Sequence, residues 1–161
     1  MTVQEIPSLS CGKRDESRAP CWELGCSAAA SGQARRLVRE WLLKWELTEL
    51  TDTALLITSE LVTNAIVHAA SPDGVALSLR LVGCPTGGCC VWVLVRDHGS
   101  GTAQAERAGR SGSFDDPMAC SGRGLDLVDH LAEAWGDATD NCCHTVWACL
   151  RCDCGFHGHA L

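Results

Sequence analysis

Apolar residues recur at helical spacing in two early segments of the chain. Between residues 31 and 46 they follow a three- and four-residue period, which predicts an amphipathic helix with basic residues on its other face. A second helix is expected to begin near Thr51 or Asp52, where a short oxygen side chain can cap it, and to end at 71–74. This second segment is apolar almost all round, so we expect the helix to be buried.

Alternating apolar and polar residues predict strands in the second half of the chain. Residues 75–82 and 89–97 alternate on either side of a Gly- and Pro-rich turn, which predicts an antiparallel hairpin. A third helix is expected over 121–135, with further strands near 134–139 and over 144–150. The predicted order is therefore two helices, a hairpin, a helix and two strands.

Three polar residues stand four positions apart within the second helix: Glu60, Asn64 and His68. At about 100° per residue they form a stripe between apolar neighbours. A buried carboxylate needs a partner, which could be a metal ion, a bound ligand, a reacting proton or a hydrogen bond between Glu60 and Asn64. This stripe is the first candidate site.

A second candidate lies where the second hairpin strand ends. Asp97 begins the sequence DHGSG, in which Gly99 and Gly101 let the backbone pass close to a flat or bulky group. An aspartate that makes its own backbone hydrogen bonds in a turn is the alternative interpretation. Residues 102–120 are long, polar and without a period, as expected of a mobile lid.

A third candidate is the start of the third helix. Gly122, Arg123 and Gly124 stand there, followed by Leu125 and the rest of an apolar stripe. Free backbone N–H groups at a helix start form an anion site, and small glycines would let phosphate oxygens approach. Arg123 could add a charge-assisted hydrogen bond.

Composition limits the possible functions. A chain of 161 residues fits one domain, and its net charge of −7 opposes binding to nucleic acid or to an anionic membrane. No apolar run approaches the roughly 20 residues that span a bilayer, and the N-terminus lacks a signal pattern. We therefore expect a soluble cytoplasmic protein whose partners include neither nucleic acid nor membrane.

The twelve cysteines do not follow the spacing of zinc modules, and we expect most to be small buried or exposed thiols. Four side chains near the C-terminus could hold a soft metal: Cys152, Cys154, His157 and His159. Otherwise that segment is expected to be a disordered tail. The expected organisation is a flexible leader at 1–30, a domain at 31–151 and the Cys- and His-containing tail at 152–161.

The order and spacing of the three candidate sites resemble those of the GHKL (Bergerat-fold) ATPase superfamily. ELVTNA resembles its N-box, DHGSG its first glycine box and GRGLDLV its second. Within that superfamily the chain looks most like the anti-sigma-factor serine kinases and their short actinobacterial relatives. The resemblance implies an α/β two-layer sandwich, with helices packed on one face of a mostly antiparallel sheet.

The resemblance also implies roles for the residues of the N-box helix. Asn64 would coordinate the Mg²⁺ that bridges the phosphates of ATP. Glu60 would be the general base that takes a proton from an acceptor serine or a water. His68 would lie at the edge of the nucleotide pocket.

The two glycine boxes would bind the rest of the nucleotide. Asp97 would accept a hydrogen bond from the adenine amine, with Gly99 and Gly101 leaving room for the ring. The second box would hold phosphate as the lid closes, through Gly122, Arg123, Gly124 and Leu125. The sequence departs from the family between its last two strands, where it has Asn141 to His144 in place of a glycine-rich turn with a basic residue.

Three functions follow from these patterns. The first is an anti-sigma-type serine kinase that binds a sigma factor, phosphorylates a serine of a STAS-type antagonist, and forms a homodimer through its first helix and the neighbouring strand. The second is a nucleotide-dependent protein-binding module without phosphotransfer. The third is a thiol or metal sensor that works through the cysteines.

Overall fold

The computed structural model describes residues 20–68, 73–84, 87–98, 122–139 and 143–153. In chain order its elements are β1 (Cys21–Leu24), α1 (Ala29–Lys44), the 3-10 turn η1 (Thr48–Leu50), α2 (Thr51–His68), β2 (Val75–Gly83), β3 (Cys89–Asp97), α4 (Gly122–Leu131), β4 (Ala134–Thr139) and β5 (His144–Cys152). The lid expected at 102–120 lies outside the described residues.

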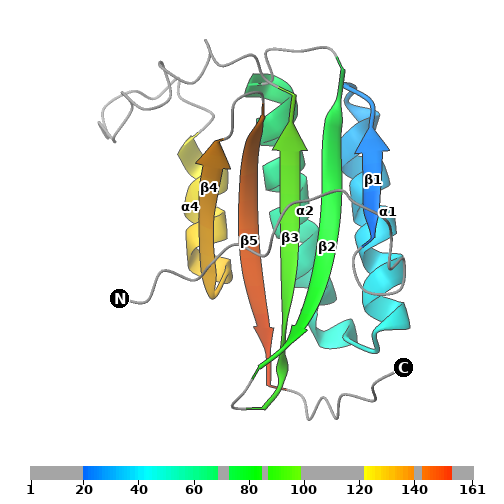
Figure 1. Ribbon diagram of the computed structural model, residues 1–161, viewed down its shortest axis with the longest axis vertical. Helices are drawn as coiled ribbons and strands as arrows, with labels where there is room; N and C mark the ends of the chain where they lie inside the picture. Colours follow the sequence, from blue (N-terminus) through cyan, green and yellow to red (C-terminus); the bar gives the residue numbers. More distant parts are fainter. Residues whose placement is uncertain (1–19, 69–72, 85–86, 99–121, 140–142, 154–161) are drawn as a thin grey trace.

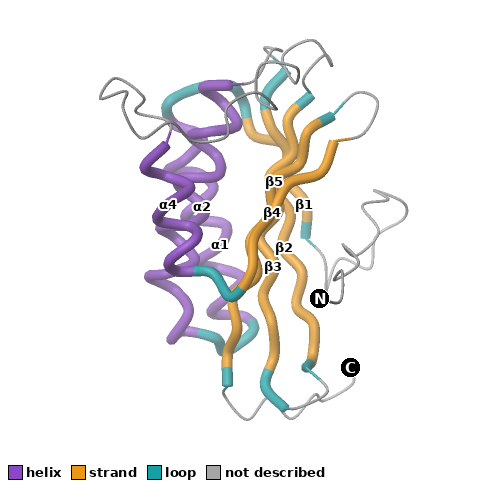
Figure 2. The backbone as a smooth tube through the Cα atoms, turned by 90° about the vertical axis from the view of Figure 1, so that its left-hand side faces the viewer, coloured by secondary structure: helices purple, strands orange, loops and turns teal. Residues whose placement is uncertain are grey.

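The strands form one sheet with the order β1-β2-β3-β5-β4, in which every neighbouring pair is antiparallel. The predicted hairpin is the β2–β3 pair. The described helices all lie on one face of this sheet, so the molecule has two layers (Figures 1 and 2). The expected α/β two-layer sandwich is confirmed.

The main core lies between the two layers. Alternate residues of the central strands point toward the helices and meet the apolar faces of α1 and α2. The larger side chains of this core are Val38, Leu42, Ile57, Leu61, Val62, Leu77, Leu79, Val91, Val93 and Leu150. Burial of one such side chain stabilises the fold by roughly 1.5–3 kcal/mol, so this interface fixes α2 against the sheet.

The strand β1 corrects the expectation that residues 1–30 are a flexible leader. It pairs with the start of β2, from Cys21 opposite Ser78 to Leu24 opposite Val75. Leu24 is buried in the main core. A four-residue strand is too short to show a period, and its partner lies far away in the sequence.

The helix predicted over 121–135 is wrong beyond Leu131, where α4 ends. The backbone N–H of Glu133 donates to the carbonyl of Cys149 at 2.9 Å, and Trp135 lies in the ladder between β4 and β5. The open edge of β5 therefore takes the chain into the sheet at a point where the apolar spacing alone would continue the helix.

The helix α2 is buried on one side only, which corrects the expectation of burial all round. Its buried residues are Ala54, Leu55, Ile57, Thr58, Leu61, Val62 and Ala65. Leu56 and Val67 have 47% and 67% of their surfaces exposed.

The segment Thr48–His68, which contains α2, is the one helical segment among the described residues that is long and apolar enough to span a membrane, judged by length and composition alone. Its mean hydropathy is 1.2. It packs against α1, α4 and β3, as the core helix of a soluble domain does.

Candidate functional site

Four elements converge at one end of the sandwich, here called the site end. The helix α2 and the strand β3 finish there, and α4 and β5 begin there (Figure 1). The antiparallel topology explains this convergence, since β5 runs opposite to β3. It brings Asn64, Asp97, Gly124 and His144 to the same end of the molecule.

Glu60 and Asn64 lie one helical turn apart on α2 and meet the first turn of α4. A β-carbon built on Gly124 would overlap Oε2 of Glu60 and would lie 3.6 Å from Nδ2 of Asn64. Gly124 is itself buried. Because this position has no side chain, the backbone at the start of α4 can approach both polar groups.

The side-chain amide of Asn64 is not satisfied within the described structure. Its Nδ2 atom is buried and has no hydrogen-bond partner. A buried polar group left unpaired destabilises a fold by about 1–3 kcal/mol, so its presence needs an explanation. Its position beside a carboxylate and a helix N-terminus favours a binding role.

Asp97 is buried at the end of β3, with 2% of its surface exposed. His144, the first residue of β5, stands opposite it in the ladder. The Nδ1 atom of His144 lies 3.7 Å from Oδ2 of Asp97, and its Nε2 atom lies 2.9 Å from Oδ2 of Asp137 on β4. The imidazole is thus held between two carboxylates and can orient the buried one.

The other predicted site residues differ in how they are placed. His68 is exposed at the end of α2, and Leu125 packs against the main core. Gly122 and Arg123 form the start of α4. Gly99 and Gly101 lie outside the described residues.

Two polar residues of this end were not singled out from the sequence. His144 was noted only as part of a departure from the family turn, and Thr145, which follows it, is buried with 3% of its surface exposed. Their positions depend on the pairing of β5 with β3, in which Asp97 faces His144 and Arg96 faces Thr145. The available signal is the pair of polar residues at the start of the last predicted strand, whereas their position beside the end of β3 follows only from the pairing of the strands.

The described residues contain no group of three or more His, Cys, Asp or Glu side chains that could hold a metal ion. Of the four predicted ligands near the C-terminus, only Cys152 is described, and it is disulfide-bonded. In this state Cys152 offers no thiolate to a metal ion, which corrects its place in the predicted set. The other three, Cys154, His157 and His159, lie outside the described residues, so their role stays a prediction.

The groups at the site end fit a magnesium nucleotide. The amide of Asn64 and the carboxylate of Glu60 offer the oxygen ligands that Mg²⁺ prefers. The start of α4 offers free backbone N–H groups to phosphate, and Gly124 leaves the space for a close approach. Asp97 offers a buried acceptor for a donor group such as an amine. This two-layer fold and this set of groups define an ATPase-type nucleotide-binding domain.

The chain belongs to the histidine kinase-like ATPase domain family, whose model matches residues 27–149. This membership confirms the superfamily expected from the three motifs, and the chain is accordingly a nucleotide-binding domain. No curated protein matches the sequence.

Two solved structures share the fold. The RsbU and RsbW domains of a Mycobacterium tuberculosis protein align with a TM-score of 0.56 and 19% identity, covering 83% of this chain and 32% of that chain. The SiaB–SiaC complex of Pseudomonas aeruginosa aligns with a TM-score of 0.57 and 11% identity, covering 84% of this chain and 91% of that chain. At such identities the likeness concerns the fold alone, and the chain spans about a third of the first protein.

Proposed function

We propose that this chain is a Mg-ATP-dependent protein serine kinase of the anti-sigma type. In this proposal it binds a sigma factor and transfers the terminal phosphoryl group of ATP to a serine of a STAS-type antagonist protein. The observation that supports it best is the meeting of Glu60, Asn64 and Gly124, where a carboxylate and an unpaired buried amide lie against a helix N-terminus.

Each of these groups has a distinct task in the transfer. The backbone at the start of α4 would hold the phosphates, and the oxygen of the Asn64 amide would hold Mg²⁺. When bound, the metal ion neutralises charge on the phosphate oxygens. Glu60 would accept the proton of the acceptor hydroxyl as that oxygen attacks, which requires it to lie within hydrogen-bond reach of the acceptor.

Asp97 would select the base. A buried carboxylate at the end of β3 can accept a hydrogen bond from the exocyclic amine of adenine but not from the oxygen that guanine has there. Gly99 and Gly101 would leave room for the ring. The imidazole of His144 would keep the carboxylate of Asp97 in one orientation.

A protein acceptor is favoured by the outer side of α2. Leu56 and Val67 lie within about 40° of Glu60 around the helix axis, and both are largely exposed. They place apolar surface before and after the proposed base along the helix axis, on the same side of it around the helix. A serine in a protein segment that packs on these two side chains would be presented to Glu60, whereas water would gain nothing from them.

The fold is also found in protein complexes. One structural neighbour, SiaB, was solved in complex with SiaC, and another is an RsbW domain that shares one protein with an RsbU domain. For the present chain we add the proposal that it works in the cytoplasm as a homodimer, with a domain that runs from β1 to β5.

The decisive experiment measures transfer of labelled phosphate from ATP to a purified STAS-type antagonist. Wild-type protein is expected to label the antagonist, and Glu60→Gln to abolish labelling while ATP still binds. The matched control is Glu40→Gln, which removes an exposed carboxylate on α1 and should leave labelling unchanged. ATP-dependent binding of the antagonist without any labelling would instead favour the binding module.

A further inference from the structure

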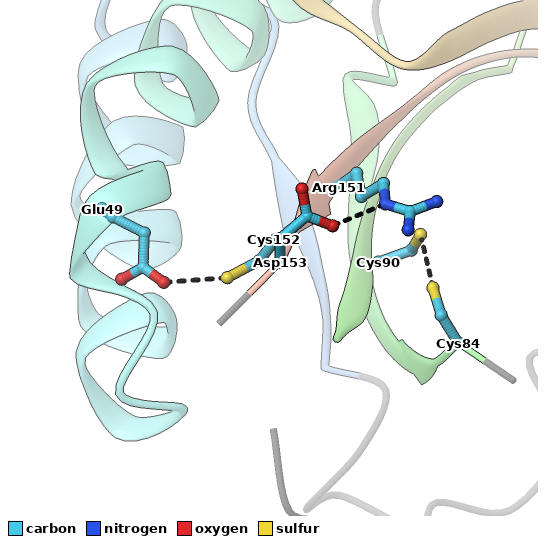
Figure 3. Close-up of polar contacts among 6 residues, drawn as sticks. All are labelled: Glu49, Cys84, Cys90, Arg151, Cys152 and Asp153. Carbon is cyan, nitrogen blue, oxygen red and sulfur yellow. Dashed lines mark hydrogen bonds and ion pairs between the residues drawn. The ribbon is translucent and has the colours of Figure 1, made fainter. Parts of the chain in front are cut away.

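Two cysteine thiols lie together at the end of the sandwich opposite the site end. Cys84 follows β2 and Cys90 lies in β3, and their Sγ atoms are 3.2 Å apart (Figure 3). Both are free thiols with intermediate exposure. A small oxidant in the solvent can therefore reach this pair.

The geometry of the hairpin turn brings the two sulfurs together. The backbone N–H of Cys84 donates to the carbonyl of Gly88 at 3.1 Å, so Cys84 stands opposite Gly88 and diagonal to Cys90 on the same face. Gly88 has a φ of 77°, which glycine adopts without strain. A β-carbon on Gly88 would overlap the carbonyl oxygen of Cys152, so the turn is fixed against β5.

The neighbouring thiol, Cys89, is not part of this pair. Successive residues of a strand point to opposite faces, and Cys89 is fully buried in the main core. Cys90 instead packs against the cluster of Trp92, Leu94 and Cys149 on the other face of the sheet. Cys90 and Cys89 therefore have very different access to solvent although they are adjacent.

The surroundings of Cys90 determine which of the two thiols reacts first. Burial, and then the hydrogen bond with Cys84, raise the pKa of the Cys90 thiol. Arg151, its ladder partner, is paired with Asp153 at 2.8 Å and is directed to that carboxylate (Figure 3). Cys90 thus keeps its proton, which leaves the sulfur of Cys84 as the first to react.

We propose that Cys84 and Cys90 form a reversible redox site that a two-electron oxidant of the peroxide class converts to a disulfide. The sulfur of Cys84 attacks one peroxide oxygen, the O–O bond breaks, and a sulfenic acid and one water result. The sulfur of Cys90 then attacks that of Cys84, the S–O bond breaks, and the second water leaves with the Cys90 proton. Two thiols and one peroxide give one disulfide and two waters.

Little movement is needed for this reaction. The sulfurs must close from 3.2 Å to about 2.05 Å, a shift that small rotations of the two side chains can supply. A dithiol reductant reverses the reaction by thiol–disulfide exchange. Cys152 also lies at this end, with its sulfur 2.8 Å from Oε1 of Glu49 (Figure 3). Because it is already disulfide-bonded, the described free thiol that could compete for Cys90 is Cys149.

The test is oxidation of the reduced full chain with hydrogen peroxide, followed by alkylation and peptide mapping. Trypsin releases residues 81–96 as one peptide, since Arg80 and Arg96 bound it, and this peptide contains Cys84, Cys89 and Cys90. We expect peroxide to protect two thiols of this peptide and a reductant to restore both. Cys84→Ser and Cys90→Ser should each abolish the reversible protection.

Two controls make the outcome decisive. Cys89→Ala should leave the protection intact, and if that variant does not fold, fragmentation of the oxidised 81–96 peptide of the wild type should show the link between Cys84 and Cys90 directly. Cys21→Ser, which removes an exposed thiol elsewhere, should leave the protection unchanged. The proposal is overturned if a link from Cys90 to Cys149 forms instead. It is also overturned if Cys84→Ser loses as many thiols reversibly as the wild type, or if oxidation in the peptide is irreversible.

Discussion

Asp97 and His144 face each other where β3 ends and β5 begins, with 3.7 Å between Oδ2 of the carboxylate and Nδ1 of the imidazole. The second ring nitrogen of His144 lies 2.9 Å from Oδ2 of Asp137. The carboxylate of Asp97, which is proposed to bind the adenine amine, is therefore oriented by His144, and His144 is held in turn by Asp137. Neither His144 nor Asp137 belongs to the two glycine boxes.

His144→Ala should weaken ATP binding because Asp97 would lose its orienting neighbour. A hydrogen bond or close polar contact of this kind contributes about 1 kcal/mol, which corresponds to a roughly fivefold rise in the dissociation constant. Isothermal titration with ATP measures it. Asp137→Asn should show a smaller rise, since that residue acts only through His144, and equal affinities for the wild type and His144→Ala would contradict the assigned role.

Asn64→Ala separates ligand binding from stability. Its Nδ2 atom is buried and unpaired, so without nucleotide the variant should unfold within about 1 kcal/mol of the wild type. For the wild type, Mg-ATP at 100 times its dissociation constant should stabilise by roughly 2.7 kcal/mol and raise the midpoint by roughly 5 to 10 °C. Thermal unfolding should show this shift in the wild type and in Thr63→Ala, and no shift in Asn64→Ala.

Gly124→Ala tests the approach of α4 to α2. The added β-carbon would overlap Oε2 of Glu60, which is the far end of a flexible side chain, so the Glu60 carboxylate must turn away from α4. We expect a loss of stability below about 1 kcal/mol and weaker ATP binding. Gly83→Ala is the matched control, because a β-carbon there meets nothing within 4 Å. Chemical denaturation and ATP titration of both variants would decide, and an ATP affinity of Gly124→Ala equal to that of Gly83→Ala would refute the close contact.

The N-box helix shows how far the sequence alone could lead. Its period predicted α2 and the common face of Glu60 and Asn64. A step of four residues turns the helix by about 40° beyond a full circle, so His68, two steps from Glu60, lies farther around the helix and is exposed. Its place at the edge of the nucleotide pocket stays a prediction.

The pairing of strands was less accessible. The position of β1 and the contact between Asp97 and His144 both depend on which strands pair with each other. The alternation of apolar and polar residues within one strand does not indicate which strand it pairs with. The end of α4 could not be predicted for the same reason, because the backbone of Glu133 hydrogen-bonds to Cys149 of β5. The family motifs identified the site end, whereas the residue that contacts Asp97 could be identified only from the pairing of the strands in the sheet.

Replacement of Leu56 and Val67 by serine should reveal whether the acceptor is a protein. Both side chains are exposed beside Glu60, so their loss should lower kcat/KM for the antagonist by about tenfold, equivalent to about 1.4 kcal/mol, without changing ATP affinity. Leu43→Ser is the control, because Leu43 on α1 is equally apolar and 56% exposed. An equal loss of kcat/KM in Leu56→Ser, Val67→Ser and Leu43→Ser would mean that the outer side of α2 has no special role in binding the acceptor.

Buried thiols should make the stability of the fold fall at alkaline pH. Burial is the main cause that raises the pKa values of Cys89, Cys90 and Cys149. In the unfolded chain thiols lose their protons near pH 8.5, while the folded chain still holds them, so the folded state binds more protons and stability declines as pH rises above that value. Below it, both states are protonated and the effect vanishes.

The decline should reach at most about 1.4 kcal/mol per pH unit for each such thiol, and it can be followed by urea unfolding under reducing conditions from about pH 7.5 to 10. The chain has no tyrosine whose ionisation would overlap. Cys149→Ala should reduce the slope by up to one thiol's share, whereas Cys26→Ala removes an exposed thiol and should leave the slope unchanged. If stability falls with pH at the same slope in the wild type and in Cys149→Ala, the burial of this thiol does not contribute to the loss of stability at alkaline pH.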